Sequence, residues 1–427
     1  MIKIPRILLF ASLAMLLTQS AWSQQSSVIT PDYCYKRLLE TYPLSRQSEL
    51  FSRIHDLQIN TLKSGNLPQL TLNGQASYQS DVTEIPIHLP NISIPAMDRD
   101  MYKATLDFSQ VIYNGGSFRQ QSEVENINLE LNQQNLETEL YKLKERINQY
   151  FVNILLLDEN TKLNNLLRED LITKSSRLES GVRNGTILQA NADVIHAEII
   201  KTDQRIIELR YNRVAVIKML SELISDTLSS NSVFEIPEPA VNTTPLKNNR
   251  PEYRVFDMLL ARFDIQKKLV DTRLRPKVSG FATLGYGRPG LNALLNEFDS
   301  YYIFGARLSW NIWNWNQTRN DRKVLDLQAG ITNTQKETFN RNVSVTVQQY
   351  IADISKLEEL IKADLQIIEL RESITKSASS QLDNGVITST DYLQELNAAL
   401  QAKLNLATHQ VQLKQARINY LAATGNL

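Results

Sequence analysis

The sequence has 427 residues, with 46 Lys and Arg against 46 Asp and Glu, so it has no net charge that would attract nucleic acid or an anionic membrane surface. Its single cysteine, Cys34, excludes an intrachain disulfide, and we expect this thiol to be buried as a packing residue. Only 14 Gly and 13 Pro are present, and they gather at a few places, which favours long helices over several small globular domains.

The N-terminus has the pattern of an export signal. Lys3 and Arg6 precede an apolar run, and the small residues Ala21 and Ser23 occupy the positions that a signal peptidase reads. We therefore predict a cleaved signal peptide over residues 1–23. The alternative, an N-terminal membrane anchor, is disfavoured because the run is too short to span a bilayer. No later segment reaches the roughly 18 apolar residues that a spanning helix needs.

The first half of the mature chain begins with a helix predicted over residues 33–63, with a turn or kink at Pro43. Two strands follow it. Apolar and polar residues alternate from Pro68 onward and again over residues 102–109, and we expect residues 82–100 between them to form a loop.

The second strand leads directly into a helix of unusual length. After Asn114-Gly115-Gly116 the sequence has neither Pro nor Gly until Gly181, which at about 1.5 Å per residue predicts a helix of roughly 95 Å. Apolar residues recur within it at the heptad spacing that is typical of a coiled coil. They are Leu136, Leu140, Leu143, Ile147, Tyr150, Ile154 and Leu157. The helix is predicted to break over residues 181–185 and to return over 188–224.

The same order of elements recurs about two hundred residues later, which indicates an internal duplication. The second set is a helix over 252–273, a strand after Pro276, a strand over 302–310, a long helix, a break over 383–386 and a last helix over 390–423. We therefore predict structural repeats over 24–228 and 253–427, joined by a Pro-rich linker over 229–252.

The four strands present apolar side chains on one face and Gln, Thr, Ser and Asn on the other, which allows two interpretations. In one, the strands form a small sandwich that caps a soluble periplasmic coiled coil. In the other, which we favour, the apolar face meets lipid and the polar face lines a water-filled lumen. Tyrosines near the strand ends would then form an aromatic girdle. They are Tyr78, Tyr102, Tyr286, Tyr301 and Tyr302.

A membrane barrel has to close, and four strands are too few to do so. The second interpretation therefore requires oligomerisation, and a trimer is the simplest solution with an open lumen. We predict a mainly α fold with a membrane β-barrel contribution, in which each chain gives a duplicated β-hairpin and a duplicated long coiled-coil helical hairpin. Three chains would form a trimeric 12-stranded barrel on an α-helical periplasmic tunnel.

Several stretches of the sequence resemble the TolC-type outer membrane efflux protein family. They are LPQLTLNGQASY, LDFSQVIYNGG, RPEYRVF, LRPKVSGFATLGY, ARLSWNIWN and the C-terminal NGVITSTDYLQELNAALQAKLNLATHQVQLKQARINYLAATGNL. The resemblance covers essentially the whole mature chain. It implies a homotrimer in the outer membrane of a Gram-negative bacterium, with a periplasmic helical domain that docks onto an adaptor protein and an inner-membrane pump. The implied function is the exit duct of a tripartite efflux or type I secretion system, and the alternative is a soluble periplasmic coiled-coil scaffold or adaptor.

The resemblance also implies a constriction at the tips of the helical hairpins. In the family, an acidic residue six positions after the second hairpin's glycine forms a ring, and counting from Gly385 places Asp391 there. The matching position in the first hairpin is Asn191, so that hairpin lacks the acid in register. The family member best known for a second carboxylate three residues further on is matched here by Gln394, which also departs from the pattern. Three Asp391 carboxylates at one axis would repel each other and bind cations. The alternative is a carboxylate stabilised by the positive end of its own helix.

Residues beside the two hairpin breaks are candidates for contact with the adaptor, although solvated turns are the more common role for such positions. They are Gly181, Arg183, Asn384 and Gly385. The junctions between strands and helices are marked by Pro68, Gly115, Gly116, Pro276 and Trp313. Trp313, together with Trp310 and Trp315, would anchor the barrel at the inner membrane interface, or Trp313 would be a core residue of the junction.

No catalytic or metal-binding pattern is present. The four histidines, His55, His88, His196 and His409, have no second ligand at helical or hairpin spacing, and the sequence has no phosphate-binding loop and no nucleophile elbow. We therefore expect no enzyme activity, no cofactor and no metal. The polar strand faces have charges of both signs, at Lys103, Asp107, Lys277 and Arg307, and indicate no ion preference.

Overall fold

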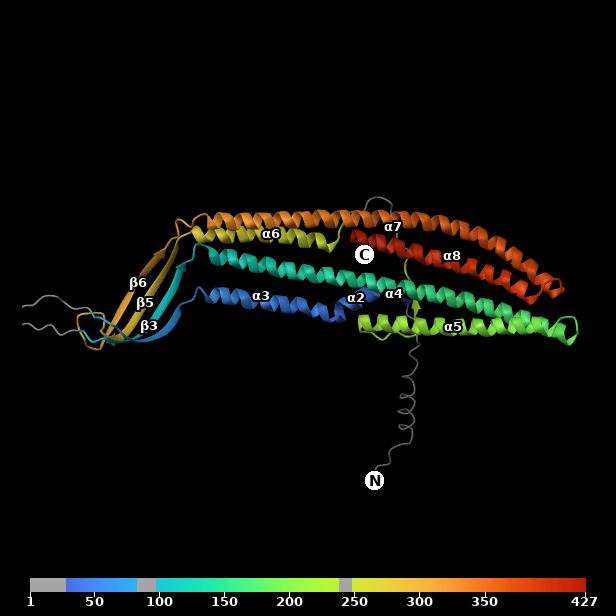
Figure 1. The fold of residues 1–427 in the computed structure, drawn as a ribbon, viewed down its shortest axis with the longest axis horizontal. Coiled ribbons are helices and arrows are strands. Elements are labelled where there is room, and N and C mark those ends of the chain that lie inside the picture. The colour runs from blue at the N-terminus through green and yellow to red at the C-terminus, as the bar shows by residue number, and fades with distance from the viewer. Residues whose placement is uncertain (1–27, 83–96, 238–247) are drawn as a thin grey trace, which may run out of the picture. The chain divides into compact units, whose positions relative to one another are not determined.

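A computed structural model describes residues 28–82, 97–237 and 248–427 of the chain (Figure 1). The predicted signal peptide lies outside the described residues, as do parts of the predicted loop and linker. None of the described helices combines the length and the apolar content that crossing a membrane requires.

The first repeat contains the helices and strands that the sequence predicts. In chain order the elements are β1 (Val28–Ile29), α2 (Pro31–Thr41), a short 3-10 helix (Pro43–Arg46), α3 (Gln47–Ser64), β2 (Gln69–Tyr78), β3 (Asp100–Tyr113), α4 (Ser117–Arg183) and α5 (Gln189–Ile224). The helix expected over 33–63 is interrupted by the 3-10 helix at Pro43, where the sequence predicts a turn or kink. Tyr42 is extended, with ψ 134°, because the ring of the following Pro43 disfavours the helical conformation at the preceding residue.

The first hairpin turn begins later than predicted, because Gly181 and Arg183 lie in the last turn of α4. A Cβ atom on Gly181 would lie 2.6 Å from Cδ1 of Ile187, so the glycine leaves room for Ile187 to pack back onto the helix. The Gly181 carbonyl also accepts a hydrogen bond from the backbone N–H of Thr186 at 2.9 Å. The glycine therefore closes the turn from within the helix instead of breaking the helix.

The second repeat follows the same order. Its elements, with the strand that precedes them, are β4 (Val233–Phe234), α6 (Pro251–Asp271), a 3-10 turn (Thr272–Leu274), β5 (Lys277–Arg288), β6 (Asp299–Ser309), α7 (Gln317–Asp383) and α8 (Ser389–Thr424). The predicted linker is in part structured, because β4 pairs in parallel with β1.

The chain divides into two compact units, and each unit draws on both repeats. One unit consists of residues 1–45, 139–250 and 341–427, and we call it the helical unit. The other consists of residues 46–138 and 251–340, and we call it the sheet unit. The predicted repeats therefore describe the order of elements along the chain, whereas compact packing groups the elements differently.

In the sheet unit, the four long strands form one antiparallel sheet in the order β2-β3-β5-β6 (Figure 1). The pairing of β3 with β5 joins the two repeats, while β2 and β6 are the edges. Directly opposed residues place Leu72, Leu106, Leu284 and Tyr302 in one row across the sheet. The alternation of apolar and polar residues in the sequence therefore corresponds to two distinct faces.

In each repeat an equivalent hydrogen bond joins the segment that follows the short helix to the end of the second strand or to the residue after it. In the first repeat, Nε2 of Gln110 donates to the carbonyl of Asn66 at 2.7 Å. In the second, Nε1 of Trp310 donates to the carbonyl of Leu274 at 2.9 Å. Both acceptors stand two residues before the proline that precedes the first strand of the repeat. Two unlike side chains thus make the same contact, which supports the duplication.

The turn from the second strand into the long helix also has equivalent backbones and different side chains in the two repeats. Gly115 and Gly116 have φ of 70° and 80°, and their counterparts Trp315 and Asn316 have φ of 51° and 63°. Glycine adopts this left-handed conformation readily, whereas a bulky side chain does so rarely. The second repeat therefore holds its turn in a strained conformation.

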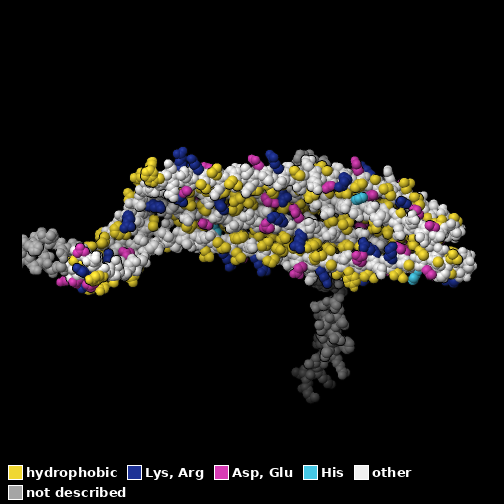
Figure 2. Space-filling model, viewed as in Figure 1, with side chains coloured by type: hydrophobic (Ala, Val, Ile, Leu, Met, Phe, Trp, Pro, Cys, Tyr) yellow, Lys and Arg dark blue, Asp and Glu magenta, His cyan; other side chains and the backbone are white. Residues whose placement is uncertain are grey.

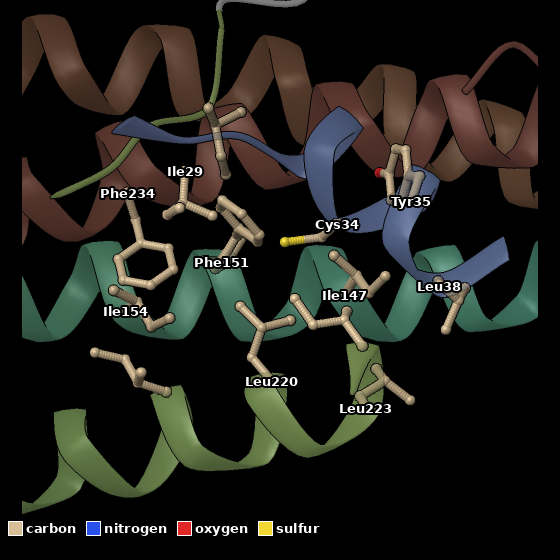
Figure 3. Packing of buried hydrophobic residues seen from close by; sticks show 14 of the residues in the cluster. Ile29, Cys34, Tyr35, Leu38, Ile147, Phe151, Ile154, Leu220, Leu223 and Phe234 are labelled. Carbon is tan, nitrogen blue, oxygen red and sulfur yellow. The ribbon is translucent and has the colours of Figure 1, made fainter. Parts of the chain in front are cut away.

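The core of the helical unit is centred on Cys34 and Phe151, whose side chains are fully buried (Figure 3). Phe234 from β4 packs edge-on against Phe151 with ring centroids 5.5 Å apart, so the β1–β4 pair is part of this core. Burial raises the pKa of the Cys34 thiol to about 12, and the nearby Asp226 adds to the shift. The prediction that Cys34 is a packing residue is confirmed.

Ion pairs join the two helices of each hairpin within the helical unit. Between α4 and α5, Arg168 contacts Asp203 at 2.5 Å and Arg213 contacts Asp158. Between α7 and α8 the pairs are Arg371–Glu395 at 3.0 Å, Lys403–Glu372 at 2.7 Å and Arg417–Glu358 at 3.0 Å, and Nδ1 of His409 adds a hydrogen bond to Asp364 at 2.6 Å. Because most of these groups are partly solvated, each pair contributes little stability, and the pairs chiefly set the register of the helices.

Candidate functional site

The apolar face of the sheet is exposed across all four strands. Leu72 is 77% exposed, Leu284 58% and Tyr302 67%, although all three lie in the row of directly opposed residues. Other exposed apolar side chains on this face are Leu70, Tyr78, Tyr102, Phe108, Tyr286, Phe304 and Leu308. A contiguous apolar surface of this kind marks contact with a protein or with lipid.

The opposite face of the sheet is polar and is organised around Asp107. The two carboxylate oxygens of Asp107 accept hydrogen bonds from Asn73 at 2.8 Å, Thr105 at 2.8 Å and Thr283 at 2.6 Å, which come from three adjacent strands. The register also places Lys103, Lys277 and Arg307 on this face, as the sequence predicts.

Aromatic rings lie over glycines on the same polar face. A Cβ atom on Gly285 would lie 2.2 Å from the Tyr301 ring, and one on Gly305 would lie 3.0 Å from the Phe281 ring. A cation approaches each ring: Nζ of Lys103 lies 5.9 Å from the Tyr301 centroid, and the guanidinium of Arg307 lies 5.4 Å from the Phe281 centroid. The rings cover backbone that glycine leaves bare, which stabilises a sheet.

The tips of the two hairpins in the helical unit are equivalent, exposed turns. Gly185 and Gly385 have φ of 68° and 70°, and neither has a neighbour where a Cβ atom would project. Arg183 donates to Oγ of Ser180 at 3.0 Å, and Asn384 donates to the Ser380 carbonyl at 2.8 Å. The side chains of Arg183 and Asn384 therefore make local contacts at the solvated end of the unit.

A buried lysine joins the two hairpins near their tips. Lys174 of α4 is 5% exposed, and its ammonium contacts Oγ of Ser379 at 2.6 Å and Oδ1 of Asp383 at 2.9 Å, both on α7. It also lies 5.1 Å from the ring centroid of Tyr392 on α8. We call these four residues the Lys174 clasp. These contacts were not predicted from the sequence.

Two further features lie beside the Lys174 clasp. Burial raises the pKa of Tyr392 to about 12, so its hydroxyl stays protonated at neutral pH. A cavity of about 320 Å³ adjoins the clasp and is lined by residues of α4, α7 and α8, among them Asp170, Arg177, Glu372 and Lys403. Groups of both signs thus surround the place where the hairpins meet.

Asn191 forms a second tie between the hairpins. Its Oδ1 accepts a hydrogen bond from the backbone N–H of Ser389, the first residue of α8, at 3.1 Å. Ser389 is fully buried. The residue that was expected to mark a constriction therefore also satisfies a free donor at the start of a helix in the other hairpin.

Asp391 takes part in a capping box at the start of α8. Its carboxylate accepts from the backbone N–H of Thr388 at 3.0 Å and from the Thr388 hydroxyl at 2.7 Å, and its own N–H donates to that hydroxyl at 3.3 Å. These bonds from Thr388 lower the pKa of the Asp391 carboxyl. The helix-capping alternative is therefore realised within one chain, and Gln394 one turn later is exposed.

The predicted junction residues lie where the strands meet the helices in the sheet unit. Pro68 and Pro276 stand immediately before β2 and β5, and Gly115 and Gly116 form the turn before α4. Trp313 is 68% exposed, so the alternative that it is a core residue of the junction is wrong for the single chain. Its ring stacks edge-on against Trp315 with centroids 5.9 Å apart.

Within the described ranges, no group of three or more His, Cys, Asp and Glu side chains is placed to hold a metal ion. On the face shown in Figure 2, acidic and basic side chains are mixed along the helices and do not form a patch of one sign.

Comparison with known proteins gives a consistent result. Residues 245–426 match the sequence model of the family described as outer membrane efflux protein. No curated protein matches the sequence. Among solved structures, the chain is similar to the outer membrane protein VceC of Vibrio cholerae, with a TM-score of 0.67 and 13% identity over 92% of this chain and 96% of that one.

Two solved outer membrane channels are also similar to this chain. For CmeC of Campylobacter jejuni the TM-score is 0.64, with 15% identity over 95% of this chain and 90% of that one. For MtrE of Neisseria gonorrhoeae, in its open state, the TM-score is 0.63, with 16% identity over 93% of this chain and 89% of that one. Residues 245–426 are thus similar to the outer membrane efflux protein family, and the chain as a whole has the fold of these outer membrane channels.

Proposed function

We propose that this protein is the outer membrane channel of a tripartite efflux or type I secretion system and conducts substrate passively. The observation that carries the proposal is the sheet, which exposes an apolar face across four strands and has two unpaired edges within the described residues. Exposing such an apolar face to water is unfavourable, and leaving the backbone groups of such edges unpaired in hydrocarbon is also unfavourable.

Closure of the sheet explains both properties. Three copies would join edge to edge as a twelve-stranded barrel in the outer membrane, with the apolar face toward lipid. The Asp107 network and the two cation-covered rings would then line a water-filled lumen. The fold similarity to outer membrane channels supports this arrangement.

The hairpin tips are the proposed contact for a periplasmic adaptor and, through it, an inner-membrane pump. Gly185 and Gly385 are exposed at equivalent turns, and Arg183 and Asn384 are the polar side chains beside them. In the trimer, three copies of Asp391 would form a ring at the constriction, with each carboxylate also capping its own α8. No step of this function requires a cofactor.

A matched pair of substitutions tests the proposal. Leu72→Arg places a charge on the apolar face, which costs about 2–4 kcal/mol per chain near the middle of a bilayer. Thr71→Arg, one residue away, places the same charge on the polar face, directly opposite Asp107. We expect Leu72→Arg to abolish assembly in the outer membrane, and Thr71→Arg to assemble and to alter ion selectivity in planar bilayers.

Fractionation distinguishes the channel from a soluble periplasmic scaffold. The wild-type channel remains with the outer membrane through washing at high salt, whereas a scaffold is released with the periplasm. Release of the wild type, or equal tolerance of the two arginine variants, would refute the proposed function.

A further inference from the structure

The end of β6 lacks a partner that its counterpart in the first repeat has. The last residues of β3, Gln110 to Tyr113, extend beyond β2 and pair only with β5, opposite residues 278–280. The equivalent residues 310–313 follow β6 and are not part of any strand. Because β6 is an edge of the sheet, no neighbouring strand is available to residues 310–313 within the described chain.

The turn that follows shows the same difference. A Cβ atom on Gly115 would lie 3.0 Å from Cβ of Arg275 and 3.2 Å from the Thr272 carbonyl, so the first turn packs closely on the residues just before β5. Nη1 of Arg275 also donates to the Gly115 carbonyl at 3.3 Å. Trp315, the counterpart of Gly115, is 84% exposed and holds a left-handed backbone that tryptophan rarely adopts.

We infer that β6 and residues 310–313 pair with β2 of a second copy of this chain in the register of β3 with β5, and that Trp315 packs on Leu67 of that copy. The inference rests on the proposed trimeric channel and goes beyond it by naming the register and the contact that joins the copies. Leu67 is the counterpart of Arg275, since each immediately precedes the proline before a strand.

When the register of β3 with β5 is applied to the contact between copies, residues of the apolar face are paired with one another. This register places Trp310 opposite Leu72 of the second copy, and Phe304 opposite Tyr78 of the second copy. All four side chains are exposed; Leu72, Tyr78 and Phe304 lie on the apolar face of their strands, and Trp310, which follows β6, continues the alternation of that strand. A shift of the register by one residue would place Trp310 opposite the polar-face residue Thr71. Such a shift would pair apolar-face residues with polar-face residues along the whole strand.

The side chains at the turn fit the same contact. In the first repeat, a long arginine faces a glycine. Between copies, the shorter Leu67, which is 58% exposed, would face Trp315, so the room taken by Arg275 becomes available to the indole ring. Both side chains lose apolar exposure on contact, which offsets the strain of the Trp315 backbone.

Cysteine pairs test the register. In a Cys34→Ala background, Trp310→Cys is combined with Leu72→Cys or, as the matched control, with Thr71→Cys, and a third variant combines Trp315→Cys with Leu67→Cys. Opposed residues of neighbouring strands bring their Cβ atoms close enough for a disulfide, whereas side chains on opposite faces do not meet. After mild oxidation we expect loss of the monomer band in favour of linked dimers and trimers for the first and third pairs, and no linkage for the control.

The outcomes separate the inference from the proposed function. If the protein is trimeric by light scattering in detergent but only the control pair forms a disulfide, the proposed channel stands and the inferred register is wrong. If Trp315 is instead quenched by brominated lipids in a trimer whose third pair does not link, the residue is a lipid anchor and the contact is wrong. A protein that is monomeric under all conditions refutes the proposed function itself. Should the double-cysteine variants fail to accumulate, unchanged thermal stability of the trimer in Leu67→Ala, which shortens the apolar contact and leaves the backbone of Trp315 as it is, would also overturn the contact.

Discussion

The Lys174 clasp allows the role of the hairpin ties to be measured. The ammonium of Lys174 is almost fully buried, while its partner Asp383 is 33% exposed and also lies 3.6 Å from Arg177. Asp383→Ala would leave a buried positive charge with only Ser379 and an aromatic ring as partners. Lys174→Met would remove that charge and place an apolar side chain of similar length in a row of buried leucines. We expect the first change to be the more damaging one.

The magnitude follows from the burial. Loss of one partner of a fully buried ion pair costs about 3–5 kcal/mol. Because Asp383 is partly solvated and two contacts to Lys174 remain, the cost falls toward that of an unsatisfied charged group, about 2 kcal/mol. One tenfold change corresponds to about 1.4 kcal/mol, so opening of the tips should become roughly 30-fold more frequent. For Lys174→Met the expected cost is below about 1 kcal/mol.

Hydrogen exchange measured by mass spectrometry on the assembled protein would follow this opening, because local opening governs the exchange of protected amides. Peptides that cover residues 174–193 and 376–396 should exchange faster in Asp383→Ala and nearly normally in Lys174→Met. Arg205→Ala, which breaks the exposed pair with Glu208, is the matched control and should change nothing. Faster exchange in Lys174→Met than in Asp383→Ala would refute the reasoning.

Cys34 should resist maleimide in the native protein at pH 7 and react only after unfolding, and labelling of the native protein would contradict its burial. Because the pKa of this thiol is raised in the folded protein, the unfolded thiol ionises first as the pH rises. The free energy of unfolding should therefore fall above about pH 9. Gly115→Ala should lower the melting temperature of the assembled protein more than Gly185→Ala. Both glycines have positive φ, but only Gly115 has neighbouring atoms close to where a Cβ atom would lie. Equal shifts in melting temperature would argue against close packing at Gly115. Asp391→Asn should raise single-channel conductance or weaken block by divalent cations, whereas Thr388→Ala, which removes the cap and keeps the charge, should do neither; equal effects would favour a cap without a ring. The lowered pKa of Asp391 also means that its contribution to helix capping is present above the ordinary carboxyl pKa and is lost as the pH falls through the lowered value, which chemical shifts of this residue would follow.

Much of the fold could be predicted because its signals are local. Alternation along β2 and β3, and the Asn114-Gly115-Gly116 turn, locate the strands and the start of α4 to within a few residues. The heptad spacing likewise identifies the buried side of α4, on which Ile147 and Ile154 are fully buried. These patterns depend on neighbours in the sequence, so no knowledge of the rest of the chain was needed.

The missed features depend on contacts between distant segments. The β1–β4 pair has two residues in each strand, which is too short for any periodic signal. Lys174 did leave one trace, since it occupies a buried position in the apolar series Leu167, Leu171, Lys174 and Leu178. A charged residue in such a series often sets the register of helices, but its partners on α7 could be named only once the hairpins were placed side by side.

The unlike turns of the two repeats have a consequence for how the protein could evolve. A closed ring of identical copies would contain two kinds of seam in strict alternation, one internal to each chain and closed by glycine, the other between chains and closed by tryptophan. Mutations at the second seam could tune how firmly copies assemble while the first seam keeps each subunit intact. Gene duplication followed by divergence at a single turn would thus have separated subunit folding from ring formation.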